Sequence, residues 1–211
     1  MTNWHHKNTA LISRSNPRYV MHCKEQIAIK NSIPKERIAD PRQVVTAWAE
    51  SIVNRLLARH FEPDDRSILT WEELGTGSTY KRKYKELDGI FKNSDGHLYV
   101  ETKATTSNSS IKKGKSQINE NLQILSRINP RFSALLVLCD CHVLDSEFGV
   151  MSDEMRLNIL SSNEYSIYEG LANIPKIIPG TKSIWLINTN AVIDLINLFG
   201  SPVDDLNDID I

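Results

Sequence analysis

The strongest constraint on the fold is a turn at residues 93–96, which has the sequence Asn-Ser-Asp-Gly. These residue types provide the side-chain hydrogen bonds and the unusual backbone angles that tight hairpin turns need. Extended segments are expected on both sides of the turn, over residues 86–92 and 97–103. The sequence therefore predicts an antiparallel hairpin, which limits the side chains that can meet across its two strands.

The register of this hairpin decides which charged side chains are neighbours. A symmetric turn pairs Lys92 with His97 and places Asp88 directly opposite Glu101. If the turn instead closes over its last two residues, Asp88 faces Lys103 and Glu101 becomes its diagonal neighbour. In either register Asp88, Glu101 and Lys103 share one face, because strand side chains alternate with period two.

Two opposed carboxylates on one sheet face need a counter-charge. Their Cβ atoms lie about 5 Å apart, and like charges at that spacing destabilise the strand pair. A Mg²⁺ ion supplies the charge, since it binds through one or two carboxylates, waters and phosphate oxygens. The backbone carbonyl of Thr102 is a further candidate ligand, and Lys103 can orient water or neutralise charge on a phosphate. The alternative is a solvated ion-pair cluster on an exposed sheet face.

A third acid is expected from the preceding helix, which is predicted over residues 40–60. An Asp-Pro start is followed there by apolar residues at helical spacing. Glu50 lies at the border of the apolar face, so it can join the two hairpin carboxylates if the helix packs beside the hairpin. Glu72 and Glu73 are rival third acids.

The rest of the pattern predicts a crossover unit. The apolar run at residues 132–139 is typical of a strand that is buried on both faces. A helix is expected just before it, over residues 116–129, and ends at Pro130. Further elements are expected, in chain order, as a strand at 67–71, a helix at 152–161, a strand at 183–188 and a helix at 191–199.

Together these elements predict one domain over residues 39–200. The expected fold class is α/β, a three-layer α/β/α arrangement whose mixed central sheet is part antiparallel hairpin and part parallel crossover. Residues 1–38 form an N-terminal arm without an assigned role, with one helix at 24–31. Residues 201–211 form an acidic C-terminal tail.

The formal net charge of -1 means that nucleic-acid contacts must come from local patches. Two basic clusters are candidate contacts: Lys81, Arg82, Lys83 and Lys85, and then Lys112, Lys113 and Lys115. The alternatives are a solvated strand edge for the first cluster and linker lysines, in a loop before the helix, for the second. Three cysteines and no segment of membrane-spanning length favour a cytoplasmic protein.

Two other motifs are weaker candidates for a functional site. Cys139, Cys141 and His142 lack the second ligand pair of a zinc site, which favours the end of a buried strand. The Gly-Thr-Gly sequence at 75–77 lacks the Gly-Lys-Ser/Thr of a phosphate loop and predicts a turn.

The sequence Asp-Gly-Ile at 88–90, with Glu-Thr-Lys at 101–103, resembles the signature of the PD-(D/E)XK nuclease superfamily. The element order is also similar, since a helix with a glutamate precedes a hairpin, a crossover helix and a buried strand. The resemblance covers residues 40–140 and implies a restriction-endonuclease-like fold. Leu87 stands where the family name has proline.

The resemblance implies a role for each site residue. Glu50, Asp88 and Glu101 would bind Mg²⁺ or Mn²⁺, and Lys103 would serve the attacking water. Some members carry a helix glutamine with a downstream tyrosine. Gln117 fits the first position and is a candidate nucleic-acid contact, although Asn121 stands four residues later.

The expected function is a divalent-metal-dependent endonuclease of the restriction, defence or mobile-element type. Double-stranded DNA is the favoured substrate, and the protein would act as a homodimer or within a larger complex. Two alternatives stay open. One is a non-catalytic nucleic-acid-binding or assembly module of the same fold, since fold alone does not carry function. The other is a nuclease that acts on RNA or on branched DNA.

Overall fold

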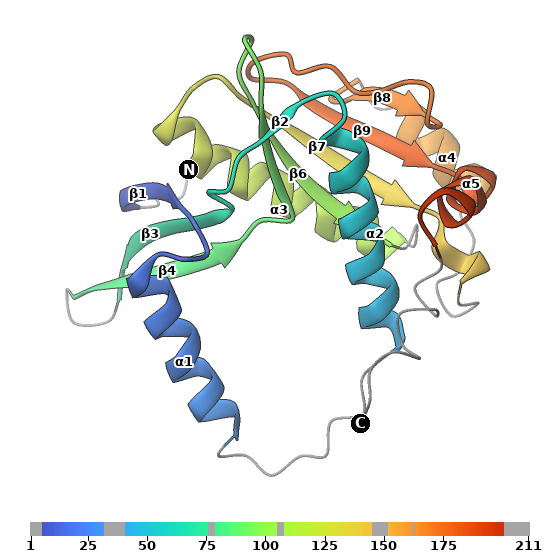
Figure 1. Cartoon of the computed structure of the whole chain (residues 1–211). Coiled ribbons are helices and arrows are strands. Elements are labelled where there is room, and N and C mark those ends of the chain that lie inside the picture. The colour runs from blue at the N-terminus through green and yellow to red at the C-terminus, as the bar shows by residue number, and fades with distance from the viewer. Residues whose placement is uncertain are drawn as a thin grey trace.

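The computed structural model describes residues 6–31, 41–75, 79–104, 108–144, 152–161 and 163–200. It is a mixed α/β fold built on two sheets (Figure 1). The larger sheet has six strands, which in spatial order are β2 (Glu62–Pro63), β5 (Gly89–Lys92), β6 (His97–Lys103), β7 (Phe132–Cys139), β9 (Lys182–Ile187) and β8 (Ser166–Glu169). The smaller sheet has three strands in the order β1 (Lys7–Ile12), β3 (Ile68–Leu74) and β4 (Tyr80–Glu86).

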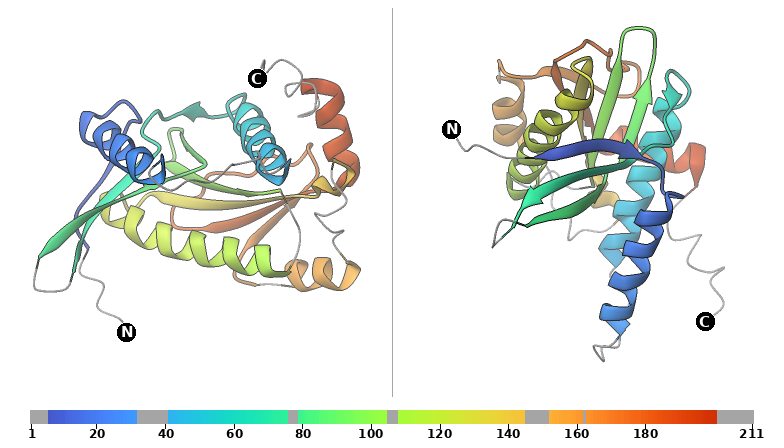
Figure 2. Two further views of the ribbon diagram at one scale, coloured as in Figure 1. Left: turned by 90° about the horizontal axis from the view of Figure 1, so that it is seen from below. Right: turned by 90° about the vertical axis from the view of Figure 1, so that its left-hand side faces the viewer.

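Helices cover both faces of the six-stranded sheet (Figure 2). They are α2 (Pro41–Leu57), α3 (Asn108–Ile128), α4 (Asp153–Leu160) and α5 (Thr189–Phe199), with a short 3₁₀ turn η1 (Cys141–Val143) after β7. Helix α1 (Pro17–Asn31) instead contacts β4 of the smaller sheet, where Tyr19 packs against Tyr84. One apolar core lies between the sheet and α2 with α5, and a second lies between the sheet and α3 with α4. The arrangement is consistent with the expected three-layer α/β fold.

The hairpin forms in the symmetric register. Lys92 pairs with His97 and Gly89 with Val100 across the antiparallel β5 and β6. In the turn, the Asn93 side-chain oxygen accepts hydrogen bonds from the backbone N–H groups of the third and fourth turn residues, at 2.8 and 3.1 Å. The first of the two predicted registers is therefore confirmed.

The predicted crossover is also present. β6 runs parallel to β7, and β7 runs parallel to β9. All eight residues of β7 are buried, because helices cover the sheet on both sides. The bounds predicted for this strand, 132–139, match those of β7.

The crossover helix is longer than predicted. α3 begins at Asn108, so Lys112, Lys113 and Lys115 lie in its first turns, and the prediction of a loop there was wrong. The buried positions Ile111 and Gly114 extend the stripe of the helix upstream. The sequence pattern did not predict this extension because glycine, here Gly114, is unfavourable inside a helix.

The prediction of an irregular segment before residue 38 was wrong for most of its described part. β1 pairs with β3, and α1 begins at Pro17 rather than at residue 24. Strand β1 depends on a partner that lies about sixty positions downstream, which a local pattern does not reveal.

The predicted strand at 86–92 is divided between the two sheets. β4 ends at Glu86 and β5 begins at Gly89. Leu87 and Asp88 connect them, and the Leu87 N–H donates to the Ser67 carbonyl at 2.9 Å. Asp88 therefore lies at the junction of the sheets, beside the end of β5.

The other predicted elements agree closely with the structure, while some predictions fall outside the described residues. Those outside are the helix cap at Asp40, residues 76 and 77 of the glycine turn, and the tail at 201–211. Within the described ranges, no helix is both long enough and apolar enough to cross a bilayer.

Candidate active site

Asp88 is held at the junction by its neighbours in space. Its Oδ2 atom accepts a hydrogen bond from the Thr102 backbone N–H at 2.7 Å. Its own carbonyl accepts from the Asn54 side-chain amide, also at 2.7 Å. Asn54 lies on α2, so this contact ties the helix to the residue that the sequence singled out. A Cβ at Gly89 would lie only 2.4 Å from the Asn54 Oδ1 atom, so this close approach needs glycine.

Glu101 is buried, with 4% of its surface exposed, so neighbouring protein groups rather than water surround its carboxylate. The Lys103 ammonium lies 2.5 Å from one carboxylate oxygen. The Tyr99 hydroxyl donates to the other oxygen. The side-chain amide of Asn121, on α3, donates in turn to the Tyr99 hydroxyl at 2.6 Å. A continuous hydrogen-bonded chain therefore runs from α3 through Tyr99 and Glu101 to Lys103.

Tyr99 and Asn121 contact the candidate site, and the sequence analysis missed both. Tyr99 could have been found, because it lies two positions before Glu101 and so shares its strand face. Burial and the Glu101 carboxylate raise the pKa of Tyr99, which keeps its hydroxyl a donor. The contact with Asn121 depends on how α3 packs on β6 and has no local sequence signal.

The carboxylates repel one another electrostatically. Burial and the neighbouring Glu101 charge raise the pKa of Asp88 from 3.8 to about 7. Burial also raises the pKa of Glu50, and the positive charge of Lys103 opposes that rise. Asp88, Glu101 and Glu50 thus concentrate negative charge, with one lysine among them.

Glu50 is the acid that the fold brings towards the pair. The pKa of Glu50 responds to both Glu101 and Lys103. The rival acids lie on β3, in the other sheet, where Glu72 bonds Arg82 at 2.6 Å and Glu73 lies 3.8 Å from Lys83.

The donor set fits a hard divalent cation. Thr102 donates its N–H towards Asp88, and in a strand the carbonyl of a residue points to the same side as its N–H. The Thr102 carbonyl therefore points to the same side of β6 as Asp88. Two carboxylates and a carbonyl suit Mg²⁺, which keeps several waters. Over the described ranges, no three acidic, imidazole or thiol side chains are grouped as a complete ligand set.

Helix α3 packs directly on the lysine. A Cβ at Gly114 would lie 3.5 Å from the Lys103 Cγ atom and 2.7 Å from Leu136. Gln117 lies one turn further along α3, between Gly114 and Asn121. Its Oε1 atom is buried and has no hydrogen-bond partner within the described part of the chain. The helix therefore lines the site from Lys103 to Tyr99, with Gln117 between them.

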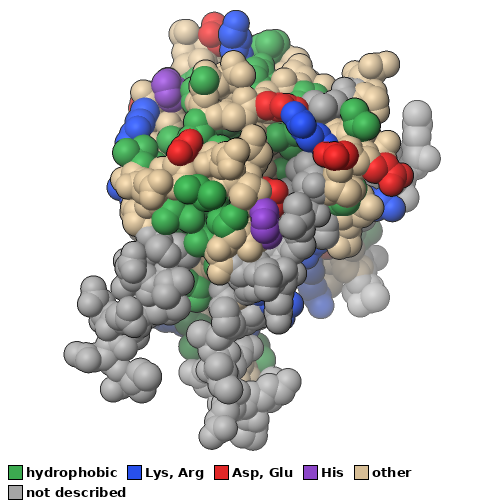
Figure 3. Space-filling view, turned by 90° about the vertical axis from the view of Figure 1, so that its right-hand side faces the viewer, with side chains coloured by type: hydrophobic (Ala, Val, Ile, Leu, Met, Phe, Trp, Pro, Cys, Tyr) green, Lys and Arg blue, Asp and Glu red, His purple; other side chains and the backbone are tan. Residues whose placement is uncertain are grey.

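The basic residues of the first cluster lie on β4, outside the sheet that carries the hairpin. Arg82 and Lys83 are engaged by Glu72 and Glu73. In the second cluster, the Lys115 ammonium lies 5.0 Å from the centre of the Tyr165 ring. On the face seen from the right of Figure 1, basic side chains are scattered among acidic and apolar ones (Figure 3).

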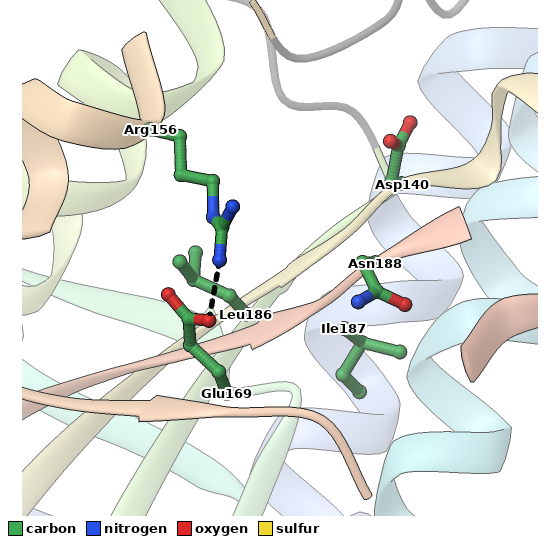
Figure 4. Close-up of a pocket in the computed structure, with 6 residues that line it drawn as sticks. All are labelled: Asp140, Arg156, Glu169, Leu186, Ile187 and Asn188. Atoms are coloured by element: carbon green, nitrogen blue, oxygen red, sulfur yellow. Dashed lines mark hydrogen bonds and ion pairs between the residues drawn. The ribbon is translucent and has the colours of Figure 1, made fainter. Parts of the chain in front are cut away.

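A separate cavity of about 170 Å³ lies at the carboxyl ends of β7 and β9 (Figure 4). Its charged groups are already paired. Arg156 bonds Glu169 at 2.7 Å, and Asp140 is bonded by His142 at 2.8 Å and by Thr189 at 2.9 Å. Cys139 ends β7 and is buried, as the strand-end interpretation predicted.

Comparisons of this chain with protein-family models, with curated proteins and with solved structures find no match.

Proposed function

We propose that this protein is a divalent-metal-dependent endonuclease with a restriction-endonuclease-like fold, and that DNA is its substrate. One observation carries the proposal: Asp88 and Glu101 meet at the hairpin with Lys103 beside them. A half-buried carboxylate whose pKa is about 7 is a costly arrangement for a purely structural site. A bound cation would offset this cost.

Each residue has a distinct role in the proposed reaction. A bound Mg²⁺ would act as Lewis acid and template for in-line attack on the phosphorus. Asp88, Glu101 and the Thr102 carbonyl would hold that ion, and Glu50 on α2 would be the third carboxylate ligand. Lys103 holds positive charge on the same face, where it orients the attacking water and neutralises charge on the phosphate.

The direct test is cleavage of labelled double-stranded DNA, single-stranded DNA, branched DNA and RNA by the full chain, with Mg²⁺, Mn²⁺ or EDTA. We expect metal-dependent cutting of DNA that EDTA abolishes. Cutting of RNA or of branched DNA alone would support the alternative substrates. If no substrate is cut, the proposed endonuclease activity is contradicted.

The Lys103–Glu101 ion pair favours one alternative, a nucleic-acid-binding module in which the lysine permanently neutralises the acid. Calorimetry with Mn²⁺ separates the two functions. The enzyme should bind the ion, and Asp88→Ala should remove the binding. The binding module should show no heat that depends on Asp88.

A further inference from the structure

A groove of about 450 Å³ begins at Asp88 and leaves the candidate active site on the α2 side. Its floor is β5, one wall is the exposed face of α2, and the other wall includes the turn between β1 and α1. α1 and α2 lie on the same side of the six-stranded sheet (Figure 2). The charged side chains that line the groove are Arg14, Arg55, Asp64 and Asp88.

The charge balance of this groove is positive away from Asp88. Asp64 is neutralised by Arg66, whose Nε and terminal nitrogen bond the two carboxylate oxygens at 2.9 and 2.6 Å. Among the described lining residues, Arg14 and Arg55 are then the remaining charges beyond Asp88 itself.

The side chains of both arginines are accessible to a ligand in the groove. The Arg14 side chain is 66% exposed and makes a loose 3.5 Å pair with Glu86 at the surface. Its charge also reaches the site, because it opposes the rise in the pKa of Glu50. The Arg55 guanidinium lies 4.5 Å from the centre of the Phe199 ring, a contact that orients it.

We propose that this groove binds the sugar-phosphate backbone of the substrate next to the scissile phosphate, with Arg14 and Arg55 contacting its phosphates. The inference rests on the proposed nuclease function and specifies which surface holds the strand. Guanidinium groups suit this task because their fixed N–H fork matches the oxygens of a phosphate.

The groove differs from the basic clusters that the sequence singled out. Arg82 is paired with Glu72 at 2.6 Å, and both Arg82 and Lys83 lie on β4, in the other sheet. On α3, Gly114 faces Lys103, and Lys112 lies two positions away, about 200° round the helix, and so on the opposite side from the site. Arg14 and Arg55 line the same groove as Asp88, and the residues of those two clusters are not among its described lining residues.

The test is binding of a labelled DNA oligonucleotide, single-stranded and duplex, to the full chain with Lys103→Ala to prevent turnover. Arg14→Ala and Arg55→Ala are combined in this background. The matched control combines Arg18→Ala and Arg59→Ala, since Arg18 lies four positions after Arg14, at the start of α1, and Arg59 also contacts Phe199, at 5.0 Å. Thermal unfolding is measured for both double variants to check that they are folded.

The variant with Arg14→Ala and Arg55→Ala should bind the oligonucleotide at least about tenfold more weakly at about 50 mM salt. The slope of log affinity against log salt should fall in magnitude by about 2. The control should keep the affinity and the slope of the background protein. Equal affinities and slopes in the two double variants would overturn the inference, while cleavage by the wild-type chain would leave the proposed function standing. If the wild-type chain neither binds nor cuts any nucleic acid, the proposed function fails and the inference fails with it.

Discussion

Asp88 lies where a negative charge is unfavourable. It adjoins Glu101, and its pKa of about 7 means that ionising it in the folded chain is costly near neutral pH. In the unfolded chain the group returns to its ordinary value of 3.8. The folded state therefore binds this proton more tightly, and ionisation lowers the free energy of unfolding as pH rises from about 4 to about 7.

Asp88→Asn should consequently stabilise the metal-free protein above pH 7. The amide oxygen still accepts from the Thr102 N–H while the charge is removed. We expect a gain on the order of 2 kcal/mol at pH 8 and no gain near pH 4. Urea unfolding in EDTA at the two pH values measures it. An equal difference at both would show that the charge is not its cause.

Tyr99 and Asn121 should act by positioning Glu101. Tyr99→Phe removes the hydroxyl between them and leaves the buried Asn121 amide without its acceptor. Loss of such an outer contact weakens metal binding about 10- to 100-fold, so Mn²⁺ calorimetry should show a reduced affinity. Tyr168→Phe, on β8, is the control. Unchanged Mn²⁺ affinity in Tyr99→Phe would remove Tyr99 from the site.

At the scale of elements, α3 and β6 form the unit that builds the site. Gly114 allows α3 to approach Leu136 and Lys103, and a Cβ there would lie 2.7 Å from Leu136 Cδ1, so the Leu136 side chain or the helix must shift. Gly114→Ala should lower the free energy of unfolding by about 1 kcal/mol, since overpacking outweighs the gain in helix propensity. It should also reduce cleavage more than substrate binding, because Lys103 shifts. Ser126→Ala on the exposed side of α3 is the control, and comparable losses in both would contradict this account.

The elements that the sequence predicted well are those with local signals. The hairpin followed from its turn, although two registers stayed open, and β7 followed from its unbroken apolar run. β1 and the two-residue β2 were missed because their stability comes from distant partners, Glu72 and Lys92 among them. Asp88, Glu101 and Lys103 could be brought together by counting along strands. The contacts of Asn54 and Asn121 could not, since they depend on helix packing.

At the scale of the whole molecule, metal binding and folding should be linked. A cation that binds the folded chain and not the unfolded chain raises the free energy of unfolding by about 2.7 kcal/mol at a hundredfold excess over Kd. Mn²⁺ should therefore raise the Tm of the wild-type protein, and EDTA should reverse the rise. A similar rise in Asp88→Ala would place the ion elsewhere.

We propose that the hairpin of β5 and β6 is a catalytic centre. Single-turnover cleavage of labelled DNA is the most decisive experiment on this proposal. The comparison is between wild type, Lys103→Ala and Lys176→Ala, which removes an exposed lysine far along the chain. We expect metal-dependent cleavage that Lys103→Ala lowers by at least about a hundredfold, with folding intact, while Lys176→Ala cuts like wild type. Cleavage by Lys103→Ala at the wild-type rate would contradict it.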